Sequence, residues 1–423
     1  MRSLRTIIPA ILLVLAAESS GISAGIPAEI PGFSPASARA DSLSLAYMVK
    51  GIVVDAQTGS RMSSVNVRVA GRNFATVSNS DGAFVIKSDE PISVLLCSFV
   101  GYQTLTLPVG GTDVVARMVP DSYRLDPSSI ISGDPLEIVR AALNQVRHNY
   151  PSRPELLKCF YRETLQKRSR YISVAEAVSR VYKSSYYGSD FGDRVALDKS
   201  RIVVSQRQRD TISVKLMGGP TIVTTSDVVK NRDMLLGDIL AGLYELEMGA
   251  PAYIGDRLQF VIHFEPAARY DFALFEGTLY IDREKLFITR VEMALDVSDP
   301  VLATRHLLRK KPAGLRFTPK EVSFVISYRY DGTVARMEYY RSVFRFNCDW
   351  RKRMFATAYT VVNETVVTDV ITPVVPIPRD QQFRTTDFMS DKAHQFLDPE
   401  FWKDYNIIEP SESLEHAAKR LQK

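Results

Sequence analysis

The chain has 423 residues, more than the roughly 100 to 200 of a typical single domain, so we expect two or three domains. Its contents of 45% hydrophobic, 10% aromatic and 24% charged residues are those of a globular protein. After residue 25 no apolar run approaches the roughly 18 residues of a membrane-spanning helix, which excludes a helical membrane protein. The net charge of +5 is small for this length and gives no reason to expect a nucleic-acid partner.

The N-terminus has the pattern of a secretory signal. Arg2 and Arg5 precede an apolar core at residues 7–17, and small residues follow it as far as Ala24. This pattern predicts a signal peptide over residues 1–24. Cleavage after Ala40, in a second A-x-A site, is the alternative. We therefore expect an exported protein, located in the periplasm or at the outer membrane.

The next region has the rhythm of a small β-sandwich. Residues 25–46 are rich in Pro, Ala, Ser and Gly without periodicity, which predicts a linker. Over residues 47–120, seven short strand-like runs recur at about ten-residue spacing with turn signals between them. In the first turn, we expect Asp55 and Thr58 to cap backbone groups and Gly59 to permit the turn, so these residues are structural and not catalytic.

A larger domain is expected over residues 134–423, after a second linker at 121–133. Asp134 before Pro135 predicts a helix that runs to Asn149. From Cys159 to about Val370, long runs that alternate polar and apolar residues predict antiparallel sheets with one buried face. The remaining predicted helices lie at 231–247 and, capped by Ser411, near the C-terminus. The fold class is therefore mainly β: a seven-stranded sandwich followed by a larger β-rich α+β domain.

No catalytic, cofactor-binding or metal-ligating residues are predicted, and no cofactor. The five histidines stand in no zinc-binding pattern: His148, His263, His306, His394 and His416. The chain has no phosphate-binding loop and no nucleophile elbow, and residues 217–220 (MGGP) are interpreted as a turn. The three cysteines cannot form a disulfide framework, although one pair is left open: Cys97, Cys159 and Cys348.

Three groups of residues are weaker candidates for a binding site. Arg162 and Glu163 are adjacent in a strand and point to opposite faces, so Arg162 needs another partner, such as Glu176; a structural ion pair is favoured. An aromatic group could stack on a ligand, but core packing is favoured: Tyr182, Tyr186, Tyr187 and Phe191. Two basic stretches, 305–312 and 350–354, could contact anionic lipid or lipopolysaccharide headgroups or be solvated turns.

Four segments of the first domain carry a family resemblance. GIVVDAQTG (51–59), VNV (65–67), TVSNSDGAF (76–84) and SFVGY (98–102) closely resemble the carboxypeptidase-regulatory-like domain, a prealbumin-like β-sandwich. Arg61 stands where that family usually carries Pro. In metallocarboxypeptidases this module is non-catalytic, so the resemblance implies an accessory role. Segments of the second region look like the second domain of envelope proteins of Bacteroidota that begin with the same module.

Three functions remain in competition. The leading hypothesis is a non-enzymatic, exported cell-envelope protein that binds or assembles with an envelope protein or a glycan. The alternative is a periplasmic carrier of lipid or another apolar ligand. A hydrolase, such as a metallopeptidase, is disfavoured by the histidine pattern. Peripheral association with the outer membrane, the identity of the ligand and the oligomeric state are left open by the sequence.

Overall fold

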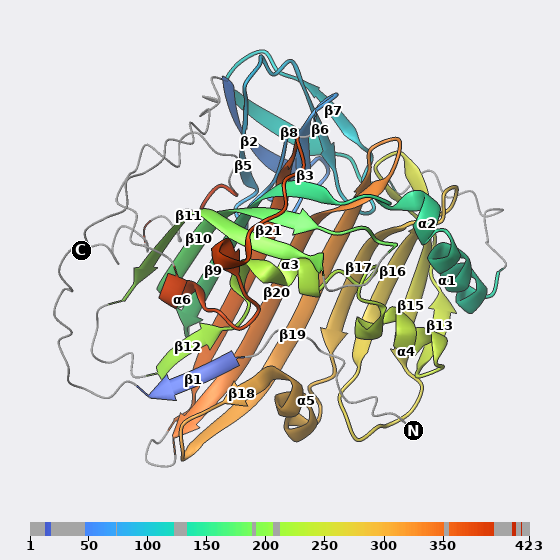
Figure 1. The fold of residues 1–423 in the computed structure, drawn as a ribbon. Helices are drawn as coiled ribbons and strands as arrows, with labels where there is room; N and C mark the ends of the chain where they lie inside the picture. Colours follow the sequence, from blue (N-terminus) through green and yellow to red (C-terminus); the bar gives the residue numbers. More distant parts are fainter. Residues whose placement is uncertain are drawn as a thin grey trace.

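The protein consists of a small β-sandwich that lies against one very large antiparallel sheet (Figure 1). The computed structural model describes residues 13–17, 47–72, 74–121, 133–187, 192–205, 212–350, 355–392, 408–411 and 416. The mainly β class predicted from the sequence is confirmed. Most of the two expected linkers, the candidate residue Phe191, His394 and the helix expected after Ser411 lie outside the described residues.

The sandwich contains the seven strands that the sequence predicted. They are β2 (Tyr47–Asp55), β3 (Asn66–Val69), β4 (Ala75–Val77), β5 (Ala83–Ser88), β6 (Val94–Ser98), β7 (Leu105–Pro108) and β8 (Asp113–Met118). One sheet has the order β5-β2-β8 and the other β4-β3-β6-β7. Alternate residues of each strand enter a closed apolar core that includes Val53, Val67, Phe84 and Leu95, as the period-two pattern requires.

The turn after β2 is built as the sequence predicted. Asp55 Oδ1 accepts hydrogen bonds from the backbone N–H groups of Gln57 and Thr58, each at 2.8 Å. Its Oδ2 accepts one from the Tyr102 hydroxyl at 2.7 Å. Gly59 has a φ of 71° and its N–H donates to the Asp55 carbonyl. These bonds, with the Thr58 and Tyr102 groups the largest causes, lower the pKa of Asp55, which is therefore a structural carboxylate.

The large sheet has 12 strands, and its neighbours pair antiparallel. They are β9 (Glu155–Lys167), β10 (Arg170–Lys183), β11 (Arg194–Val204), β13 (Tyr244–Met248), β14 (Ala252–Ile254), β15 (Arg257–Pro266), β16 (Phe275–Asp282), β17 (Ile288–Leu295), β19 (Leu315–Tyr330), β20 (Ala335–Trp350), β21 (Thr357–Ile371) and β22 (Gln382–Phe383). Their order is β13-β15-β16-β17-β19-β20-β21-β9-β10-β11-β22, with β14 beside β15. Strand β9 pairs with β21, so the first and the last long strands of this domain lie side by side although they are far apart in the sequence.

Short helices lie along one face of this sheet (Figure 1). They are α1 (Pro135–Asn144), α2 (Val146–Asn149), η3 (Gly219–Thr221), α3 (Ile222–Thr225), η4 (Arg232–Met234), α4 (Leu236–Leu240), α5 (Pro300–Leu307), η5 (Arg379–Gln381) and α6 (Met389–Lys392). The predicted N-cap is confirmed, since Asp134 accepts a hydrogen bond from Leu136 N–H, although the helix breaks at Gln145. The helix predicted at 231–247 is wrong in its second half: Gly242, with φ of 78°, ends it, and β13 follows.

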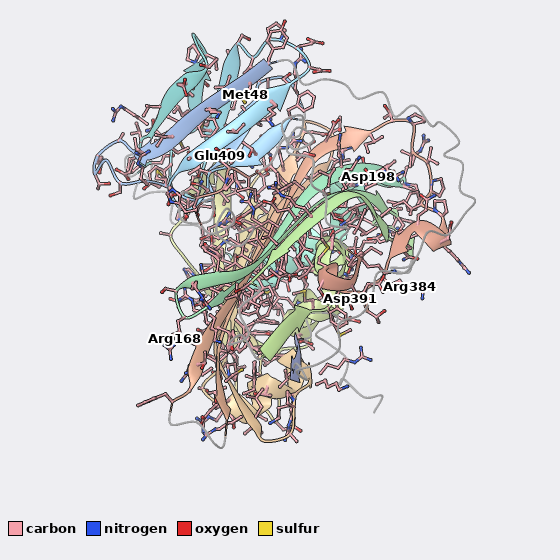
Figure 2. The ribbon with its side chains drawn as sticks, turned by 90° about the vertical axis from the view of Figure 1, so that its left-hand side faces the viewer. Met48, Arg168, Asp198, Arg384, Asp391 and Glu409 are labelled. Carbon is pink, nitrogen blue, oxygen red and sulfur yellow. The ribbon has the colours of Figure 1, made fainter. Side chains whose placement is uncertain are left out.

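Both faces of the central strands are buried, and each packs against a different partner. Tyr161 and Tyr340 belong to the large core beneath α1, α3 and α4, which we call the helix-facing side. Their chain neighbours Phe160 and Tyr339 point the opposite way and pack with Val77 of β4 in the sandwich. We call this the sandwich-facing side. Figure 2 shows Glu409 at the base of the sandwich, where its carbonyl accepts a hydrogen bond from Asn79 Nδ2 at 3.0 Å.

A small fourth sheet includes part of the expected signal peptide. Strand β1 (Leu13–Ala17) pairs antiparallel with β12 (Ile212–Leu216) and parallel with β18 (Leu308–Lys310). These five residues belong to the apolar core of the expected leader, and removal of the leader stays a prediction. Among the residues that are described, no helix has the length and apolar character needed to span a membrane.

Replacement of Gly59 by Val should destabilise the sandwich. A Val Cβ would meet open space there, so the cost comes from the positive φ, which is about 1–2 kcal/mol for a residue with a Cβ. Gly110→Val is the matched control, since Gly110 is also surrounded by open space but has no positive φ. Scanning calorimetry of the full chain should show a lower melting temperature for Gly59→Val alone. Equal melting temperatures for both variants would refute the structural role of Gly59.

Candidate functional site

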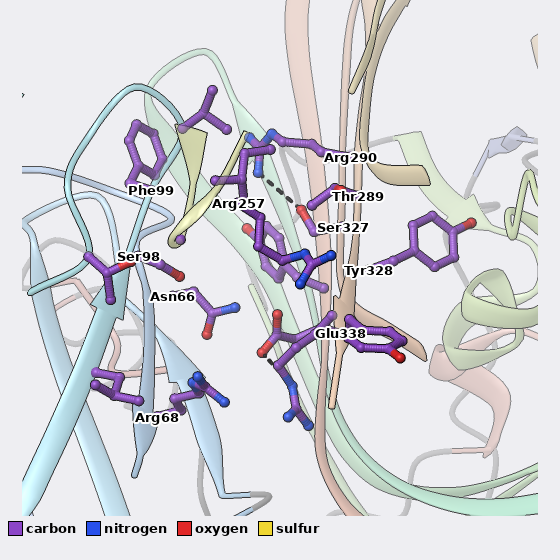
Figure 3. A pocket seen from close by; sticks show the side chains of 18 of the residues that line it. Asn66, Arg68, Ser98, Phe99, Arg257, Thr289, Arg290, Ser327, Tyr328 and Glu338 are labelled. Atoms are coloured by element: carbon purple, nitrogen blue, oxygen red, sulfur yellow. Dashed lines mark hydrogen bonds and ion pairs between the residues drawn. The ribbon is translucent and has the colours of Figure 1, made fainter. Parts of the chain in front are cut away.

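A pocket of about 450 Å³ lies between the sandwich and the large sheet (Figure 3). One wall is the outer surface of the sandwich sheet β4-β3-β6-β7. In β3, Val67 and Val69 enter the sandwich core, so Asn66 and Arg68 point outward. Asn66 pairs in register with Ser98 of β6, and Arg68 pairs with Leu96. Phe99 and Thr104 in the loop after β6 complete this wall.

The opposite wall comes from strand ends of the large sheet. Arg290 of β17 pairs in register with Ser327 of β19 and donates to its hydroxyl at 3.0 Å. Arg329 lies two residues further along β19, on the same side of the strand as Ser327. Glu338 of β20 joins them at the bulge between β19 and β20. Tyr328, between Ser327 and Arg329, points away from the pocket (Figure 3).

The tight turn between β14 and β15 closes one end of the pocket. Gly255 lies in this turn with a φ of 63°, and a Cβ there would lie 3.7 Å from the Thr104 hydroxyl. The Gly101 N–H donates to the Tyr253 carbonyl across the two domains at 3.2 Å. A second contact across the domains joins the hydroxyls of Ser64 and Tyr339 at 3.5 Å. The sandwich is therefore held in a defined position over the sheet.

Arginine side chains dominate the chemistry of this pocket. Arg257 forms a bidentate pair with Asp282 at 2.5 and 2.8 Å, and Arg290 pairs with Glu292 at 2.6 Å. Arg329 lies 3.3 Å from Glu338 Oε1. These three guanidinium groups therefore each have a carboxylate partner.

Arg68 differs from the other three guanidinium groups. Within the described part of the chain, its side chain has no hydrogen bond or ion pair, although it is half-buried. Burial, and then the nearby charge of Arg329, lower the pKa of Arg68. The carboxylates of Glu338 and Asp256 act in the opposite direction without cancelling this effect. Arg68 is a cation that the protein partly desolvates and that forms no ion pair with a carboxylate of the described residues.

Two polar atoms of the lining are also left without partners. Among the described residues, Asn66 Oδ1 and Thr104 Oγ1 are closed to solvent and form no hydrogen bond, whereas Glu338 Oε1, also without a hydrogen bond, has its ion pair with Arg329. A buried polar atom without a hydrogen bond costs about 1–3 kcal/mol, so native proteins leave few of them. Asn66 Oδ1 and Glu338 Oε1 are acceptors only, so a ligand that donates hydrogen bonds would match this lining.

The residues that the sequence singled out lie elsewhere, on both sides of the sheet. Arg162 and Glu163 point to opposite sides, as predicted, and the partner of Arg162 is Glu176, with Nε and Oε1 2.7 Å apart. Arg201 contacts the second oxygen of Glu176, and the Ile408 carbonyl accepts from Arg162 at 2.6 Å. Burial alone would raise the pKa of Glu176, but the two guanidinium charges hold it below its usual range. This group is a structural ion network.

The predicted aromatic group is dispersed. Tyr187 is exposed, with Arg147 over its ring, and Tyr182 packs in a separate small cluster. Tyr186 reaches the helix-facing core and donates to the buried carboxylate of Asp227 at 2.6 Å. Lys183 forms an ion pair with the same carboxylate. Only Tyr186 thus contributes to a polar centre, and its partners fully satisfy Asp227.

Glu163 lies on the helix-facing side and is the second polar feature of that core. The Tyr161 hydroxyl donates to it at 2.8 Å, and Asn363 is its register partner on β21. Burial raises the pKa of Glu163 to about 7, and the hydrogen bond from Tyr161 only partly opposes this effect. No basic side chain is among the causes of this shift, so Glu163 is a carboxyl group that the fold keeps close to neutral.

The thiols and histidines provide no metal site among the described residues. Cys97, Cys159 and Cys348 are buried and unpaired, and burial raises the pKa of each to about 12. His263 is exposed in β15 and contacts the Thr278 hydroxyl. Residues 217–220 form a buried turn, as the sequence predicted, in which Gly218 has a φ of 87°. Of the basic stretches, 305–310 forms the end of α5 and β18, and 351–354 is not described.

Sequence reasoning missed the pocket, and only a weak signal pointed to it. Asn66 and Arg68 appear in the sequence as the outward positions of an alternating strand, which are normally solvated. The polar residues of β19 and β20 also alternate with apolar ones, so the sequence predicts that they too are solvated. The pocket exists because two such surfaces, more than 200 residues apart in the chain, face each other.

Glu163→Gln should change how stability depends on pH. Burial raises the pKa of Glu163 in the folded chain to about 7, above the ordinary value of 4.5. The wild-type chain therefore has its full stability below pH 4.5 and loses stability as the pH rises from there through 7. Gln has no charge to bury, so the free energy of unfolding of the variant should exceed that of wild type by roughly 3 kcal/mol at pH 8. At pH 4 the difference should be small. Urea unfolding at both pH values measures this. Glu137→Gln, at an exposed helix position, is the control, and identical pH profiles for all three proteins would contradict the prediction.

Comparison with known proteins agrees with the sandwich. A family model described as CarboxypepD_reg-like domain matches residues 49–120. A search of curated proteins gave no match. The segments GIVVDAQTG and SFVGY, on which the sequence resemblance depended, both lie within the matched residues.

Three solved structures show low similarity to the chain. A DUF1329 family protein from Desulfovibrio piger is 9% identical with a TM-score of 0.26, covering 57% of this chain and 96% of its own. A LolA superfamily protein from Nitrosomonas europaea is 10% identical with a TM-score of 0.20, covering 56% and 94%. A putative membrane-associated protein of unknown function from Bacteroides fragilis is 10% identical with a TM-score of 0.15, covering 77% and 98%. Residues 49–120 are thus a CarboxypepD_reg-like domain, joined in this chain to a large antiparallel sheet.

Proposed function

We propose that this protein is a non-enzymatic binding protein of the cell envelope that holds a glycan in the pocket between its two domains. The observation that carries the proposal is a pair of buried polar atoms on the sandwich wall that form no hydrogen bond, Asn66 Oδ1 and Thr104 Oγ1, with Glu338 on the opposite wall held by its ion pair with Arg329. A ligand rich in hydroxyl groups supplies the hydrogen bonds that these atoms lack. The free energy of binding then includes the relief of their desolvation.

The dimensions and walls of the pocket favour a sugar over a protein surface. A cavity of about 450 Å³ lies within the range of small-ligand sites, about 300–1,000 Å³, and is too narrow for a folded partner. Phe99 and Tyr330 line it and offer apolar surface to the C–H face of a sugar ring. Polar groups on two rigid sheets fix the orientation of the ring.

The envelope location depends on the sequence. Arg2, Arg5 and the apolar stretch that follows them support export. The CarboxypepD_reg-like domain supports an accessory role without catalysis. Of the two carboxylates that line the pocket, Glu338 is paired with Arg329, and Asp256 lies in the turn between β14 and β15.

The lipid-carrier alternative needs an open apolar cavity, and the helix-facing core is the place where the large sheet could provide one. In the described residues this core is closely packed: Leu235, Leu236 and Ile239 of the η4–α4 segment and Val228 are at most 1% exposed. The packing favours the glycan proposal over the carrier.

The test uses the full chain on a glycan array, with titration calorimetry on any glycan that is retained. We expect binding by wild type and its loss in Ser98→Trp, because Ser98 lines the pocket and an indole would fill it. Val115→Trp is the matched control, since Val115 is half-exposed on β8 in the other sandwich sheet.

Either of two results would overturn the proposal. One is the absence of any bound glycan together with co-purifying lipid in native mass spectrometry, which would favour the carrier. The other is binding by Ser98→Trp that equals that of wild type while both variants keep the wild-type melting temperature, because the glycan would then lie outside the pocket.

A further inference from the structure

We propose that the glycan is acidic and that Arg68 binds its carboxylate or phosphate group. This inference rests on the proposed function and names the ligand class of the same pocket. Three of the four guanidinium groups in the lining form an ion pair with a carboxylate, and Arg68 does not. Arg68 also lies on the sandwich wall, where its side chain points into the pocket.

Of the four guanidinium groups in the lining, Arg68 alone has no ion-pair partner among the described residues, although the carboxylates of Glu338 and Asp256 are near enough to act on its charge. Asp282 and Glu292 neutralise Arg257 and Arg290 at distances of 2.5–2.8 Å. Glu338 is the buried carboxylate of the remaining pair, and it lies next to Arg329. Arg68 has no carboxylate within the distance of an ion pair among the described residues, so its charge is available to a ligand.

The position of Arg68 suits an anion better than it suits water alone. The side chain is half-buried, and a second guanidinium, Arg329, is near enough to repel it. An anion between the two groups would remove this repulsion and form charge-assisted hydrogen bonds. The planar guanidinium can bind two oxygens of a carboxylate or phosphate at once, whereas an ammonium group acts as a point charge.

The neighbours of Arg68 restrict what the rest of the ligand can be. Asn66, two residues earlier on β3, presents an acceptor toward the same pocket, and Glu338 presents another from the opposite wall. Asn66 Oδ1 lacks a donor and Glu338 has only its ion pair with Arg329, so both can accept from a sugar hydroxyl, which an anionic group cannot replace. Glu338 would also repel a second negative charge on its side. The ligand class is therefore a saccharide with one acidic group at the Arg68 end and hydroxyl groups at the Glu338 end.

The first test compares related glycans on the array used for the proposed function. Glycans that carry a uronic acid or a sugar phosphate should bind at least about tenfold more tightly than their neutral parents. Comparison of the uronic acids with the phosphates identifies which anion is preferred. Binding of the acidic members should weaken between 50 and 500 mM NaCl, because salt screens charge. If neutral glycans bind equally well, the inference fails and the proposed function stands; if no glycan binds, the proposed function fails.

The second test changes Arg68 itself. Arg68→Ala should lose about tenfold in affinity for the acidic glycan and leave the neutral parent almost unchanged, while Arg68→Lys should recover part of the loss. Arg117→Ala is the charge-matched control, because Arg117 is exposed on β8 in the other sandwich sheet. Melting temperatures show whether each variant folds. An Arg68→Ala protein that folds and keeps the full preference for acidic glycans would overturn the assignment of Arg68.

Discussion

The docking of β4 on the large sheet is the contact on which the remaining features depend. Val77 of β4 packs with Phe160, Val178 and Tyr339 on the sandwich-facing side, and Ile408 joins the same cluster. Apolar burial of this kind stabilises by about 25 cal/mol per Å² and has no preferred direction, so hydrogen bonds such as Gly101 N–H to Tyr253 must fix the orientation. Without this contact the two walls of the pocket would be separate, solvated surfaces.

The same strands explain why charges are buried on both sides of the sheet. A strand with two buried faces cannot place its polar residues in solvent, so each must find a partner. On the sandwich-facing side Glu176 takes two guanidinium groups, and on the helix-facing side Asp227 takes Lys183 and two tyrosine hydroxyls. Buried pairs of this kind add little net stability, but breaking one costs about 3–5 kcal/mol. They therefore oppose a shift of strand register, which would reverse the faces.

Local features of the fold were predictable from the sequence, and features of assembly were not. The turn at Asp55, the N-cap at Asp134 and the seven sandwich strands follow from residues within a few positions of each other. The second half of the helix predicted at 231–247 is wrong, because residues 244–248 pair with β15 as a strand. This tertiary pairing outweighs helical propensity. The partner of Arg162 could be named because Glu176 lies in the adjacent strand with the correct alternation. Nothing local indicates that Arg68 faces Arg329.

The location of the pocket shows how the outward surface of a β-sandwich can form one wall of a binding site. The sandwich core needs only the inward residues of β3 and β6, so the outward positions are free to vary without a cost to folding. Asn66, Arg68 and Ser98 occupy such positions, and the large sheet encloses them. A ligand that bridges Arg68 and Glu338 would contact both domains and stabilise their docked arrangement in proportion to its occupancy. Ligand binding and association of the two domains would then be coupled, so that each favours the other. A pocket inside one domain could not couple them in this way.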